Sequence, residues 1–255
     1  MLNFTTGKFI TSLTSIIRDK NSIISKLIAV CIFTLFPKRQ WYKMVFGVSY
    51  ISRFIIKLTT INKNSLGLVR ANNINRLLAL LTRSGKSFPI PYRITGETQI
   101  EHSSGLILCT VHLPLVKVAI MAFMKSHHVD AVIVGSPTID NKMGVWGVTE
   151  RIPVLLSDSS VLLKTKSILA KNGTVVLMVD KDLMGEFSPN IMRLCGKLGA
   201  KVMFFFAELK PDGTIDTPFI QAPHPYCESE TAIFDNLELM RQTTQEILMR
   251  YNSPG

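Results

Sequence analysis

The stretch "GLILCTVHLPLVKVAIMAFM", from Gly105 to Met124, decides the fold class. Its first half, "LILCTV", is a short aliphatic run of the kind found in fully buried strands. The run stops at His112, and Pro114 then opens a second apolar run, "PLVKVAIMAFMKS", which predicts a helix. A buried strand that passes at once into a helix favours a parallel sheet covered by helices.

The same alternation continues through the rest of the chain. We predict strands at "YRITG", "DAVIVGS", "IPVLLS" and "TVVLMVD", and two more strands around the turn in "AKVMFFFAELKPDGTIDTPFIQAP". Helices are predicted at "SDSSVLLKTKSILAKNG", at "SPNIMRLCGKLG" and from about Thr231 to Tyr251. Residues 89–255 are therefore expected to form one α/β domain with a largely parallel central sheet flanked by helices.

The segment 1–88 differs in charge and in pattern. The first hundred residues contain fifteen Lys and Arg residues against only Asp19 and Glu97, and they carry all the excess of a chain with net charge +11. Apolar residues recur at helical spacing in "VSYISRFIIKL" and "INRLLALLTRSG", until the two prolines of "SFPIPY" break the pattern. We expect a basic, amphipathic, helical segment that associates with a membrane, because such a surface suits an anionic partner.

The longest apolar run in this segment, "LIAVCIFTLF" from Leu27 to Phe36, spans ten residues. About twenty are needed to cross a bilayer, so this run is too short to span one alone. It predicts either a buried core helix or a helix lying in the membrane interface. The nearby Trp41, Tyr42 and Lys43 favour the interface.

The four cysteines do not form a metal or disulfide pattern. Cys31, Cys109, Cys195 and Cys227 are far apart, without a C-x-x-C pair, and each lies in or beside an apolar stretch. Such cysteines usually act as small hydrophobic residues. We therefore expect no metal site, and no spacing typical of a phosphate-binding loop is present.

Titratable residues follow two of the predicted strands. His112 ends "LILCTVH", and Asp180 and Asp182 end "TVVLMVDKD". Binding and chemistry in open α/β sheets gather beyond the carboxyl ends of the strands. A histidine there, just before a helix, is a candidate general base, although a single histidine is also common in purely structural roles.

Three blocks, "GLILCTVHLPL", "LAKNGTVVLMVDKDLMGEF" and "RLCGKLGAKVMFFFAELKPDGT", resemble the lipid A late acyltransferase branch of the lysophospholipid acyltransferase superfamily. The resemblance covers residues 90–225. It implies transfer of a fatty acyl chain from an acyl carrier protein or coenzyme A thioester to a hydroxyl or amine of a lipid acceptor. It also implies a peripheral or monotopic protein on the cytoplasmic face of the inner membrane, with no metal or bound cofactor.

The family motif is a histidine, four residues, and then an aspartate or glutamate. His112 matches the histidine, but the acid position is Lys117. An ammonium there does not orient the imidazole or stabilise its protonated form. Three explanations are open: Asp180 or Asp182 replaces the missing acid, His112 works unassisted on an easy acceptor, or the fold has kept lipid binding and lost the chemistry.

Other candidate residues are basic or polar side chains near the predicted strand ends. Lys117, Arg151 and Lys181 are candidates for binding a phosphate of the acceptor or donor, against the alternative of solvated surface residues. Asp180 and Asp182 fit equally well as caps of nearby backbone amides. Ser159 and Ser160 are expected to cap the helix that follows them.

Two classes of function therefore compete on the sequence. The first is an acyltransferase with His112 as general base, and the second is a catalytically inactive lipid-binding or scaffold relative. A carboxylate within hydrogen-bonding reach of His112 favours the first, and a ring packed inside the apolar core excludes it. Nucleic acid is not an expected partner, because the basic residues alternate with aliphatic ones and no recognition motif is present.

Overall fold

The computed structural model describes residues 66–83, 90–96, 104–134, 142–145, 151–180 and 186–252. Its helices are α5 (Leu66–Arg83), α6 (Val116–Met124), α7 (Val161–Leu169), α8 (Asn190–Leu198) and α9 (Glu230–Asn252). Its strands are β1 (Tyr92–Gly96), β2 (Leu106–Thr110), β3 (Ala131–Val134), β4 (Lys142–Met143), β5 (Ile152–Leu156), β6 (Thr174–Met178), β7 (Lys201–Phe205), β8 (Glu208–Leu209) and β9 (Ile215–Gln221). The helices predicted before residue 66 and the apolar run 27–36 lie outside these ranges.

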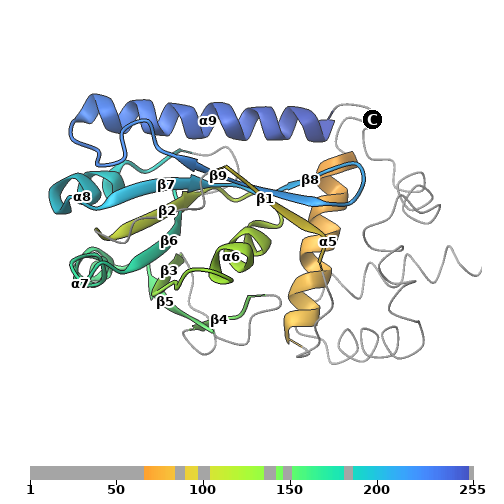
Figure 1. Ribbon diagram of the computed structural model, residues 1–255, viewed down its shortest axis with the longest axis horizontal. Helices are drawn as coiled ribbons and strands as arrows, with labels where there is room; N and C mark the ends of the chain where they lie inside the picture. Colours follow the sequence, from red (N-terminus) through yellow and green to blue (C-terminus); the bar gives the residue numbers. More distant parts are fainter. Residues whose placement is uncertain are drawn as a thin grey trace, which may run out of the picture.

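The strands form one sheet in the order β1-β9-β7-β2-β6-β3-β5-β4, with β8 paired to β9 (Figure 1). The five central strands, β7, β2, β6, β3 and β5, are all parallel, as the alternating sequence predicted. The strands expected around the Pro-Asp-Gly turn pair antiparallel, β9 with both β7 and β8. The prediction did not include the pairing of β1 with β9 or the short strand β4.

Helices cover both faces of the sheet. The connection from β2 through α6 to β3 and the connection from β5 through α7 to β6 run in opposite directions across the sheet. Right-handed crossovers therefore place α6 and α7 on opposite faces. On the α6 face, the centroids of the Phe123 ring and of the Phe219 ring of β9 lie 5.8 Å apart. On the other face α8 packs between α7 and α9, and the long α9 runs along one side of the molecule (Figure 1).

The strand at the centre of the sheet, β2, is buried along its whole length. The preceding residue, Gly105, leaves no room for a side chain, because a Cβ there would lie 2.5 Å from the carbonyl oxygen of Leu169 at the end of α7. The opening stretch of sequence is therefore packed from its first residue, and it fixes α7 against the start of β2.

The α5 helix contacts α9 and β8, at the end of the sheet where the parallel strands finish (Figure 1). Its residues Ala71, Ile74 and Leu78 are buried and recur at helical spacing. None of the helices within the described ranges has the length and hydropathy required to cross a membrane.

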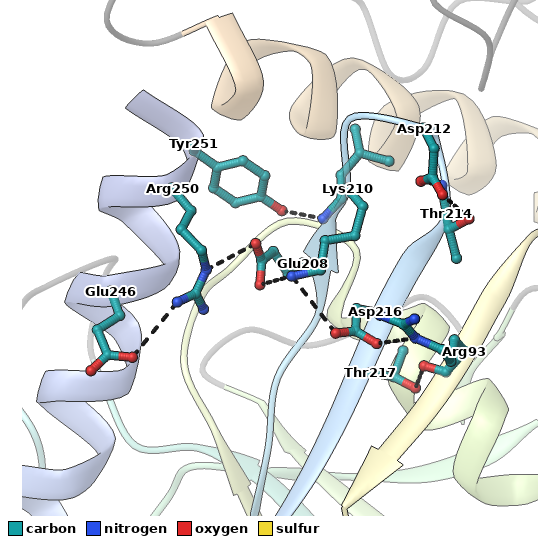
Figure 2. Close-up of polar contacts among 11 residues, drawn as sticks. Arg93, Glu208, Lys210, Asp212, Thr214, Asp216, Thr217, Glu246, Arg250 and Tyr251 are labelled. Carbon is teal, nitrogen blue, oxygen red and sulfur yellow. Dashed lines mark hydrogen bonds and ion pairs between the residues drawn. The ribbon is translucent and has the colours of Figure 1, made fainter. Parts of the chain in front are cut away.

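A network of ion pairs joins β8, β9, β1 and the last turn of α9 (Figure 2). The Glu208 carboxylate is almost fully buried, and it lies 2.8 Å from Lys210 Nζ and 3.0 Å from Arg250 Nε. On the other side of Lys210, Asp216 accepts a hydrogen bond of 3.1 Å from Arg93 Nε, which raises the pKa of Arg93. Glu246 lies 3.6 Å from Arg250 and ends the network, which therefore alternates three basic and three acidic groups and neutralises itself.

Candidate active site

The chain leaves β2 through an unusual turn. Thr110 still accepts a sheet hydrogen bond from the Val179 amide, at 2.9 Å, and the Leu113 amide then bonds back to the Val111 carbonyl at 2.7 Å. Leu115 adopts a left-handed conformation with φ 68°, and α6 begins at the next residue. A left-handed leucine costs about 1–2 kcal/mol, and strain of this kind often accompanies functional sites. The apolar run is interrupted at His112 because this turn carries the residue out of the sheet.

Asp180 holds His112 through both its ring and its backbone. His112 Nδ1 lies 2.9 Å from Asp180 Oδ1, and the backbone amide of His112 donates to both carboxylate oxygens at 3.0 Å. The carboxylate side chain is fully buried, whereas 43% of the imidazole is exposed. The buried carboxylate of Asp180 thus fixes the orientation of the imidazole, and the other side of the imidazole is exposed to solvent.

This contact determines which nitrogen can act as a base. An ionised carboxylate only accepts hydrogen bonds, so Nδ1 carries the proton in the neutral ring. The free nitrogen, Nε2, then has the lone pair that accepts a proton from an incoming nucleophile. Buried Asp180 is also placed to stabilise the imidazolium that results.

Other histidines in the described part of the chain have weaker carboxylate partners. His128 lies 3.7 Å from Asp130, and His224 lies 3.3 Å from Asp235, with both acids substantially exposed. An exposed carboxylate competes with water for the ring and orients it poorly. The His112–Asp180 pair differs from these two pairs because its acid is buried.

A second segment of chain closes against Asp180. Asp180 and Phe187 form an antiparallel bridge, and the Ser188 amide donates to the Val179 carbonyl at 2.8 Å. Phe187 also lies under the Arg241 guanidinium of α9, at 5.5 Å from the ring centroid. Sequence reasoning did not identify Phe187, because nothing local to it signals a partner at the end of β6.

The hydroxyl of Thr110 is a further polar group near the site that sequence reasoning missed. Thr110 is the last residue of β2, is fully buried, and its Oγ1 has no hydrogen-bond partner in the structure. Its side chain points to the same face of the strand as Leu108, which follows from the two-residue period of a strand.

The remaining predicted site residues are placed as follows. Lys117 is exposed in the first turn of α6, five residues after His112. Lys181 and Asp182 lie outside the described residues, directly after Asp180. Ser160 does not cap α7 as expected, because its hydroxyl donates to Asp158 Oδ1 at 2.6 Å instead of to the helix.

Arg151 is not brought to His112. It immediately precedes β5. The pairing register across β3 and β6 places Val154 of β5 at the same height along the strands as Leu108 of β2. Arg151 therefore lies towards the amino ends of the strands and His112 beyond their carboxyl ends. The strand rise between these two positions is roughly 20 Å. A shared phosphate site at His112 that includes Arg151 does not fit this register.

Comparison with known proteins adds no assignment: the sequence matches no protein-family model and no curated protein. No cluster of three or more potential metal ligands occurs among the residues that the structure describes.

Proposed function

We propose that the protein is an acyltransferase, in which His112 is the general base and Asp180 the acid that orients it. The donor is a fatty acyl thioester of acyl carrier protein or coenzyme A, and the acceptor is a hydroxyl or amine of a lipid or glycolipid. The observation that carries the proposal is the 2.9 Å contact between an exposed imidazole and a buried carboxylate at the carboxyl edge of a parallel sheet.

The proposed reaction needs one proton transfer in each direction. Nε2 of His112 removes the proton of the acceptor hydroxyl or amine while the acceptor attacks the thioester carbonyl. The tetrahedral intermediate then expels the thiolate, which takes the proton back from the imidazolium. The C–S bond breaks, an ester or amide bond forms, and His112 returns to its neutral form. Because a thioester is already activated, positioning contributes most of the remaining rate.

The main argument against this activity is the missing acid of the family motif, and Asp180 is proposed to replace it. The sequence departs from the family motif at Lys117, and that departure favoured a catalytically inactive scaffold. In the proposed site, the buried carboxylate of Asp180, two residues after the neighbouring strand β6, takes the place of the acid that the motif lacks. Lys117, exposed near the same turn, is proposed to contact a phosphate of the donor or acceptor. The basic segment 1–88 is proposed to hold the protein at the cytoplasmic face of the inner membrane.

The test is acyl transfer from labelled acyl carrier protein or acyl coenzyme A to a membrane lipid extract by the purified full chain. We expect a labelled lipid with the wild type and none with His112→Ala. The matched control is His224→Ala, which removes another exposed histidine that faces a carboxylate, and it should retain full activity. Equal product from His112→Ala and the wild type would remove His112 from the mechanism, and no product with any donor would favour the scaffold reading.

A further inference from the structure

The first turn of α7 exposes two adjacent leucines. Leu162 is 44% exposed and Leu163 is 71% exposed, whereas Thr165 and Leu169 of the same helix are buried. Single exposed apolar residues are common on protein surfaces, but here two exposed leucines occupy consecutive positions in one helical turn. The helix therefore has an inner face that packs on the sheet and an outer apolar tip.

Lysines surround this tip. Lys164 and Lys166 are exposed, and at 3.6 residues per turn Leu163 lies between them around the helix. Lys171 is exposed just beyond the end of the helix. No acidic residue occurs within α7, and the nearest one before it, Asp158, bonds to the amide and hydroxyl of Ser160 at 2.8 and 2.6 Å. The outer face of α7 is thus both apolar and basic.

The tip lies at the same edge of the sheet as His112. The pairing register across β3 and β6 places Leu156, at the end of β5, at the same height along the strands as Thr110, at the end of β2. The α7 helix starts just after Leu156, so its first turn lies beyond the carboxyl ends of the strands. Three strand spacings separate β5 from β2, which is about 14 Å.

We propose that the first turn of α7 docks on an anionic phospholipid bilayer. Leu162 and Leu163 enter the boundary between headgroups and acyl chains, and Lys164 and Lys166 extend their stems to the anionic headgroups. This contact turns the His112 edge of the sheet towards the lipid. The inference rests on the proposed function, because it supplies the surface from which a lipid acceptor reaches His112.

The chemistry favours a bilayer over an acidic protein. The cores of protein–protein interfaces are depleted in lysine, since its charge is costly to bury. A lysine beside a membrane keeps its ammonium among the headgroups, and each basic residue near an anionic surface strengthens binding about fivefold. Leu163, which is flanked on both sides by lysines, therefore fits a lipid surface best.

The test places a polarity-sensitive fluorophore on Leu163→Cys in the full chain, with Cys31→Ser to remove a competing thiol. The control carries the same label on Phe234→Cys, a residue of α9 that is 60% exposed. Vesicles contain phosphatidylcholine with or without phosphatidylglycerol, and a second set contains brominated acyl chains as a quencher. We expect a blue shift and quenching at position 163, only with phosphatidylglycerol, and neither at position 234.

Two outcomes would overturn the proposal. One is a label at position 163 that stays in water while the protein sediments with the vesicles. The other is a label that responds to an acidic carrier protein and not to lipid. In unlabelled protein, Leu162→Ser/Leu163→Ser should weaken vesicle binding about tenfold. Because His112→Ala should dock normally, a failure of docking is distinguished from a failure of acyl transfer.

Discussion

Asp180 combines a structural and a proposed chemical role at the scale of one residue. A fully buried carboxylate is costly unless its oxygens accept hydrogen bonds, and here the His112 amide and ring supply them. The same contacts that make burial tolerable also fix the ring. Sequence reasoning could name Asp180 and Asp182 as candidates but could not choose between them, because the choice depends on which carboxylate turns towards β2.

Replacing Asp180 by Asn tests the orienting role. The amide keeps the size of the side chain but removes the charge that fixes Nδ1 as the protonated nitrogen, and in an analogous triad this change costs about 10⁴-fold in rate. We expect a similar loss of acyl transfer, measured as initial rate at saturating donor.

A readout independent of activity accompanies this variant. Nitrogen-15 NMR of the imidazole should show His112 protonated at Nδ1 in the wild type and a mixture of tautomers in Asp180→Asn. Asp180→Asn with an unchanged tautomer and an unchanged rate would contradict the role assigned to Asp180.

Thr165 offers a second test at the residue scale. Its side chain is fully buried in α7, and its hydroxyl has no hydrogen-bond partner in the structure. Replacement by the isosteric Val removes an unsatisfied polar group and keeps the packing, so Thr165→Val should raise the free energy of unfolding by about 1 kcal/mol. Urea unfolding measures this change. A loss of stability would show that the hydroxyl has a partner.

At the scale of elements, local patterns predict helices and strands better than they predict how the elements pair. The strands β2, β5 and β6 and the helices α7 and α8 formed within a few residues of their predicted limits. The α8 helix ends as expected, at Gly199 in a left-handed conformation with φ 61°. The pairing of β1 with β9 could not be predicted, because their residues are more than a hundred positions apart.

A buried hydroxyl joins α9 to β8, beside the ion pair between Glu208 and Arg250. The Leu209 amide of β8 donates to the Tyr251 hydroxyl at 2.8 Å, and both residues are buried. Tyr251→Phe leaves that amide without a partner, which should cost about 1–3 kcal/mol of unfolding free energy. Glu246→Gln is the control, since Glu246 is exposed and lies 3.6 Å from Arg250, and it should change stability by less than about 0.5 kcal/mol. Equal effects of the two changes would contradict this account.

At the scale of the whole molecule, the core draws together cysteines that are distant in sequence. Cys109 of β2, Cys195 of α8 and Cys227 before α9 are all buried. Burial raises the pKa of Cys109 and Cys195 well above the ordinary range, and it raises the pKa of Cys227 to about 11. The sequence indicated the apolar setting of each thiol, but the packing of α8 against β7 and α9 depends on strand order.

These thiols should report global unfolding. A thiolate is the reactive form, and burial disfavours it at all three positions. We expect iodoacetamide at neutral pH to leave Cys109, Cys195 and Cys227 unmodified in the native protein and to modify all three in urea, as measured by peptide mass mapping. Rapid native modification of any one of them would show that its part of the core opens separately.

Alkaline pH should destabilise the fold as a whole. Burial raises the pKa of Tyr251 from 10.0 to about 12 and that of Cys227 from 9.0 to about 11. Because both groups lose their protons first in the unfolded chain, their contribution to stability is complete below pH 9 and disappears as the pH rises through the folded values. The urea midpoint should therefore fall steadily above pH 9. Tyr251→Phe should reduce the part of this fall that occurs above pH 10, and a midpoint independent of pH in this range would contradict the burial of both groups.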